Sequence, residues 1–96
     1  MSEESEAPPF KPVEAMQNLK RRLHDLRLAE RAGAFELRGQ TVVELSVGDT
    51  AIETRLAKRP ARTPEWTRHS LKSSADVRRF IESVKQQLAR WNAADE

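Results

Sequence analysis

The stretch FELRGQTVVELSVGDTAIETRLAK, residues 35–58, decides the fold because its hydrophobic residues recur at every second position. Glycine-containing turn signals interrupt it at residues 39–40 and 48–49. Alternation of this kind predicts strands with one buried and one wet face. We therefore expect a three-stranded antiparallel meander, with these side chains pointing outward: Glu36, Arg38, Glu44, Ser46, Glu53 and Arg55.

A helix is predicted before this sheet. Pro12 suits a first helical position because its missing N–H is not needed there. Steps of three and four then separate the apolar residues up to about Ala32, and Gly33 offers a stop. The expected buried seam consists of Val13, Met16, Leu19, Leu23 and Leu26.

A second helix is predicted after the sheet, and its signal is the clearest in the chain. Ser73 or Ser74 can cap its first turn, where Asp76 suits the helix dipole, and it should end near Asn92. One stripe of its surface is apolar: Val77, Phe80, Ile81, Val84, Leu88 and Trp91. The predicted fold is α+β, in the order helix, three- or four-stranded antiparallel meander, helix, with both helices on one face of the sheet.

The uncertainty in strand number lies after the segment KRPARTPEW, residues 58–66. Its two prolines break the sheet pairing, so we expect a connector. Residues 66–72 then form either a fourth, edge strand or part of a short helical turn over residues 64–69. The sequence leaves both alternatives open.

Length and composition indicate one domain. We expect residues 1–10 to be a disordered acidic tail, residues 11–92 a single α+β domain, and residues 93–96 a disordered acidic C-terminus. The 96 residues include no cysteine, which excludes disulfides, a thiolate nucleophile and cysteine-ligated metal sites. The acidic N-terminus does not resemble a secretory signal and no stretch is apolar enough for a membrane span, so we expect a cytoplasmic protein without membrane contact.

No catalytic or metal-binding pattern is recognisable. His24 and His69 are far apart in sequence and lack a ligand-like spacing, so we interpret both as structural. Three glycines in the whole chain do not suffice for a phosphate-cradling loop. We expect a protein that is not an enzyme and that uses no cofactor and no metal.

Charge suggests one class of partner. Five of the 15 acids lie in the predicted tails, which leaves 17 Lys and Arg against ten acids between Lys11 and Asn92. A basic body of this kind suits either solubility alone or binding to nucleic acid. Trp66 is a candidate for stacking on a base, and the candidate polyanion-binding residues are Arg55, Lys58, Arg59, Arg62 and Arg68.

Leu28 suggests another class of partner, a protein. On the predicted first helix it lies opposite Leu23 and Leu26, where it is exposed unless the helix has ended or a second subunit covers it. Leu28 is therefore a candidate interface residue. Our first hypothesis is a small non-enzymatic protein-interaction module. It would bind a protein partner or associate with itself, for example as a homodimer. The alternative is a basic accessory protein that contacts nucleic-acid phosphates through residues 55–69.

Overall fold

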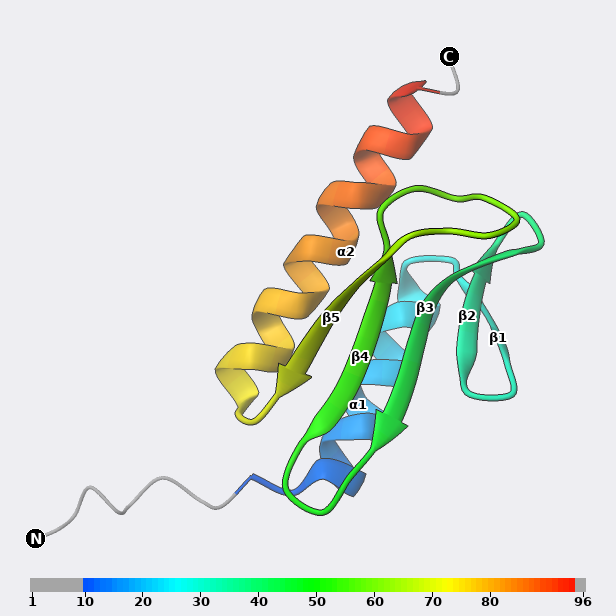
Figure 1. Ribbon diagram of the computed structural model, residues 1–96. Coiled ribbons are helices and arrows are strands. Elements are labelled where there is room, and N and C mark those ends of the chain that lie inside the picture. Colours follow the sequence, from blue (N-terminus) through cyan, green and yellow to red (C-terminus); the bar gives the residue numbers. More distant parts are fainter. Residues whose placement is uncertain (1–9, 95–96) are drawn as a thin grey trace, which may run out of the picture.

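The computed structural model describes residues 10–94, and side chains as far as Asn92. A helix precedes five strands and a longer helix follows them (Figure 1). In chain order the elements are α1 (Pro12–Asp25), β1 (Ala29–Arg31), β2 (Ala34–Leu37), β3 (Gln40–Val47), β4 (Ile52–Ala57), β5 (Trp66–Leu71) and α2 (Ser74–Ala94).

The strands form one antiparallel sheet in the order β1-β2-β3-β4-β5, so each strand pairs with its neighbour along the chain. The predicted α+β class and meander are confirmed, but the sheet has five strands rather than three or four. Residues 66–71 are a strand and not a helical turn, because they pair with β4 along its whole length.

The additional strand, β1, lies where the sequence predicted the end of the first helix. That prediction is wrong: α1 stops at Asp25, and Arg27 has a φ of 70°, which a helix does not allow. Ala32 and Gly33, with φ of 52° and 83°, form the two-residue turn between β1 and β2. Positive φ at both positions matches the right-handed twist of a hairpin, so Gly33 turns a hairpin instead of ending a helix.

The turn between β2 and β3 is built in the same way. Arg38 and Gly39 have φ of 55° and 84° and are enclosed by the pair Leu37 and Gln40. The turn therefore begins one residue earlier than the expected Gly39-Gln40. Alanine and arginine rarely occupy the first position of such a turn, where asparagine or aspartate is favoured, so these hairpins carry no strong sequence signal.

A bulge interrupts the pairing of β2 with β3. Phe35 pairs with Val43, but Glu36 pairs with Thr41, so Val42 is an extra residue on β3. The kink lets both Val42 and Val43 enter the core, where both are fully buried. Strict alternation from Glu44, which was predicted to point outward, buries Val43 and exposes Val42.

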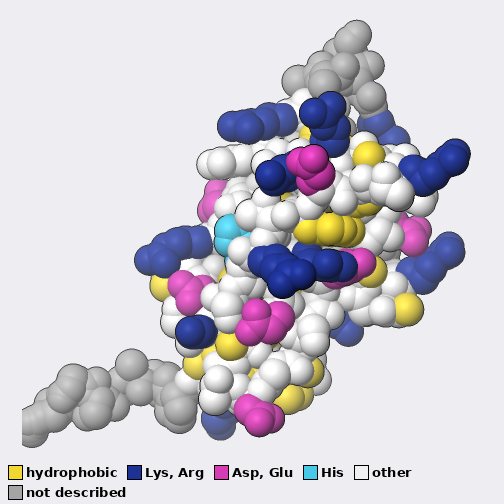
Figure 2. Space-filling model, in the orientation of Figure 1, with side chains coloured by type: hydrophobic (Ala, Val, Ile, Leu, Met, Phe, Trp, Pro, Cys, Tyr) yellow, Lys and Arg dark blue, Asp and Glu magenta, His cyan; other side chains and the backbone are white. Residues whose placement is uncertain are grey.

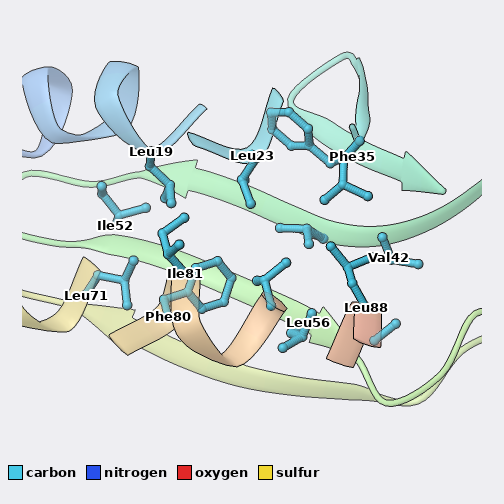
Figure 3. Packing of buried hydrophobic residues seen from close by; sticks show 14 residues of the cluster. Leu19, Leu23, Phe35, Val42, Ile52, Leu56, Leu71, Phe80, Ile81 and Leu88 are labelled. Carbon is cyan, nitrogen blue, oxygen red and sulfur yellow. The ribbon is translucent and has the colours of Figure 1, made fainter. Parts of the chain in front are cut away.

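One hydrophobic cluster contains side chains from both helices and from the sheet. In Figure 3, Leu19 and Leu23 of α1 point into the same interior as Phe80 and Ile81 of α2. The helices contact each other, and α1 also contacts β3 while α2 contacts β5. The predicted stripe of α2 is confirmed, since its central residues are buried. Val13 departs from the predicted seam of α1, because it is 63% exposed.

The ends of the domain differ slightly from the prediction. Phe10 was assigned to the N-terminal tail but packs against the core, and α2 continues past Asn92 to Ala94. Residues 1–9 and 95–96, where the rest of the acidic tails were predicted, lie outside the described residues. Neither described helix combines the length and apolar character that a membrane span requires.

Candidate functional site

The sheet presents a polar face opposite to the core, which we call the open face. Val43 and Leu56 are core residues, so Glu44 and Arg55, their neighbours along β3 and β4, point the other way. Trp66 on β5 pairs with Ala57 and shares this orientation. Two rows of side chains cross the open face from β3 to β5: Glu44, Arg55 and Arg68 in the first row, and Ser46, Glu53 and Ser70 in the second.

Arg55 is held in place at the centre of the open face. Its Nε donates to Glu44 Oε1 at 2.9 Å, and its Nη2 donates to the same oxygen. Its guanidinium carbon lies over the Trp66 ring, 4.9 Å from the ring centroid. Trp66 is half-buried and packs against the core cluster, so the indole is itself anchored. The result is a cation–π pair of indole and guanidinium, in which a carboxylate holds the guanidinium.

A shallow depression lies beside this pair. All side chains of the two rows except Ser70 line it, with Arg55 and Arg68 in the first row and Ser46 and Glu53 in the second. Ser70 Oγ donates to Glu53 Oε2 at 2.9 Å, which orients that carboxylate. Within residues 10–92, Glu53 Oε1 and the second carboxylate oxygen of Glu44 have no hydrogen-bond partner. The depression therefore offers hydrogen-bond acceptors together with the guanidinium of Arg68.

The connector, residues 58–65, joins the end of β4 to the start of β5 and therefore lies next to Trp66. The amide of Lys58 donates to the Glu65 carbonyl at 2.8 Å, which closes the loop at its base, and the two side chains approach to 3.9 Å. Farther out, Arg62 and Pro64 line a depression together with Gly39 of the β2–β3 turn. In Figure 2, Lys and Arg side chains predominate at the end of the open face where the connector lies.

Three of the predicted cationic residues are exposed and have no acidic partner. Within the described side chains, no carboxylate lies at salt-bridge distance from Arg59, Arg62 or Arg68. Arg55 differs from them, because Glu44 already neutralises it. Of the residues that sequence analysis selected, the structure brings Arg55, Trp66 and Arg68 together on the open face and places Lys58, Arg59 and Arg62 on the adjoining connector.

Leu28 does not belong to any surface site. Sequence analysis expected Leu28 to be exposed unless the helix had ended or a subunit covered it, and the structure shows that the helix has ended: Leu28 is 3% exposed and belongs to the core cluster. The physical reason is the early end of α1: with Arg27 in the left-handed region, the chain turns and points Leu28 inward. The candidate interface based on this residue is therefore absent from the surface.

The two histidines lie in separate environments. His24 Nε2 and Lys20 Nζ each lie 3.0 Å from the carboxylate of Glu30, and these hydrogen bonds hold the pKa of Glu30 below its ordinary value of 4.5 against the opposing effect of burial. His69 lies on β5 with its ring edge-on to Phe80. Among residues 10–92, no group of three or more His, Asp or Glu side chains is arranged to hold a metal ion.

Sequence reasoning missed part of the site. Glu44 and Glu53 were predicted only as outward-facing, because their relation to Arg55 depends on strand register, which alternation does not reveal. A separate shallow groove between α1 and α2 is lined by Arg22 and Arg78, which also carried no signal beyond their charge.

Comparisons with protein families, with curated proteins and with solved structures found no match to the chain, so its function is argued from this geometry alone.

Proposed function

We propose that the protein binds nucleic acid by contacting phosphates through the connector and β5. The observation that carries this proposal is the set of three exposed arginines, Arg59, Arg62 and Arg68, which have no acidic partner in the described part of the chain. An unpaired guanidinium on a protruding loop can form bidentate hydrogen bonds with phosphate without first breaking an ion pair. Lys58 adds a weaker contribution, because Glu65 competes for it at 3.9 Å.

The arrangement of layers supports this choice. The proposal takes both helices to cover one face of the sheet, which is supported by their mutual contact and by their shared core. The open face and the connector are then accessible together, so a bound strand can pass from one to the other. The competing hypothesis of a protein-interaction module, with self-association as one form, loses its main support with the burial of Leu28.

Salt dependence gives the direct test. Each phosphate contact to a single strand contributes about −0.7 to the slope of log affinity against log salt concentration, so three arginine contacts predict a slope of about −2. Fluorescence anisotropy with labelled single strands and duplexes, measured at several salt concentrations, gives this slope. No binding at low salt would refute the proposal.

A double variant, Arg59→Gln with Arg62→Gln, should reduce the slope to about −0.7. The matched control is Arg21→Gln with Lys72→Gln, which removes the same charge from two exposed positions on α1 and after β5. If both variants weaken binding equally, the effect comes from net charge and not from the connector.

A further inference from the structure

We infer that the depression on the open face accepts one unpaired nucleobase, with guanine preferred; this rests on the proposed function and adds base selection to it. The inference starts from charge. The charged side chains that line the depression are two carboxylates, Glu44 and Glu53, and two guanidinium groups, Arg55 and Arg68, so their formal charges cancel and a phosphate gains no net attraction there. A base edge that carries N–H donors would find acceptors there instead. The depression is therefore suited to a base, while the unpaired Arg59 and Arg62 on the connector are suited to the backbone.

The cation–π pair of Trp66 and Arg55 supplies the platform. Guanidinium planes and aromatic rings are the usual surfaces on which proteins stack unpaired bases. The Arg55 guanidinium lies over the indole on one side, and its side chain keeps 38% of its surface exposed. Its orientation is fixed by the two hydrogen bonds to Glu44, so little side-chain entropy remains to be lost on binding.

The polar groups around the platform match guanine. Its Watson–Crick edge carries two neighbouring N–H donors, which a single carboxylate can accept together, and its Hoogsteen edge carries the O6 and N7 acceptors that pair with arginine. Glu53 retains a free oxygen, and Ser70 orients the other, so this carboxylate can accept from the first edge. Arg68 is unpaired within the described residues and lines the same depression. Its guanidinium has five N–H donors, so it can donate to the second edge and also to a neighbouring phosphate.

The base must be unpaired. In a duplex its faces are covered by stacking and its Watson–Crick edge is occupied, so neither the platform nor Glu53 can reach it. Single strands should therefore bind through both phosphates and base, whereas duplexes should bind through phosphates only.

The test uses single strands of equal length that consist of thymine except at one central position. That position holds guanine, adenine, cytosine or thymine, and the guanine strand is also measured after annealing to its complement. A Trp91→Phe background leaves Trp66 as the only tryptophan, so that its fluorescence reports on the platform. We expect the guanine strand to bind about fivefold or more tightly than the other three and to quench Trp66, and annealing to abolish this advantage.

The substitution Glu53→Gln distinguishes recognition of the base from general electrostatic attraction. The substitution removes a negative charge from an anion-binding surface, so general electrostatics would strengthen binding to all four strands, whereas the guanine preference should disappear. Glu82→Gln on α2, also exposed, is the matched control and should keep the preference. Equal affinity for all four strands, or a preference that survives Glu53→Gln, would overturn the inference while leaving phosphate binding intact. Absence of binding to every strand would overturn both proposals.

Discussion

The substitution Leu28→Ala separates the observed fold from the one that helical periodicity suggests. Leu28 follows the left-handed residue Arg27 and is 3% exposed within the core cluster. Removing a leucine side chain from such a site costs about 2–5 kcal/mol, because the transfer free energy of the lost atoms adds to that of the cavity left behind. For a domain of this size, each kcal/mol corresponds to a shift of about 4–8 °C in Tm. Leu28→Ala should therefore lower Tm by at least about 8 °C.

The measurement is thermal unfolding followed by circular dichroism, with urea unfolding to obtain the free energy directly. Val13→Ala is the matched control, since Val13 is a 63% exposed apolar residue of α1 and its truncation should cost less than about 0.5 kcal/mol. If Leu28→Ala behaves like Val13→Ala, the leucine is at the surface, α1 extends beyond Asp25, and β1 does not exist as described.

Three further variants test other parts of the structure. Ala32→Asn places a residue that tolerates positive φ in the β1–β2 turn and should raise Tm by a few degrees in a thermal melt. Ser73→Ala removes the hydroxyl that accepts from the Asp76 amide at 3.1 Å, and urea unfolding should show a loss of about 1 kcal/mol. Glu30 has a lowered pKa, so its stabilising effect is present above pH 4.5 and is lost as pH falls through its folded-state pKa. The Tm difference between wild type and Glu30→Gln should accordingly shrink on acidification below 4.5.

The parts of the fold that were predictable are those with long, uninterrupted periodicity. The apolar stripe of α2 runs from Val77 to Trp91, and its helical spacing brings these residues onto one face, where they are buried in the core or pack against it. The alternation in β3 and β4 is equally clear, apart from Val42 at the bulge. The start of β1 could not be predicted, because the helix ends where Arg27 adopts a positive φ and the next turn uses a positive φ at Ala32, and neither residue type signals such a conformation. Tertiary packing of Leu28 overrides the local preference there.

The candidate site was predictable only in part, for a related reason. Arg59 and Arg62 were selected because prolines fix them in a connector, and that placement needs no register. Whether Arg55 is free or neutralised depends on its pairing with Glu44, which is set by the turn and strand alignment of β3 with β4. Alternation along the sequence indicates which face of the sheet each residue occupies. It does not indicate which residue lies beside it on the adjacent strand.

The unbroken order of the meander has a consequence for how the chain folds. Each strand pairs with the one before it, so the sheet can grow by successive hairpins, each closing a short loop at a small entropic cost. The contact of α1 with α2 is different, because it joins opposite ends of the chain. Average contact order is therefore low within the sheet, and we expect folding to begin there, with docking of the N-terminal helix as the late step.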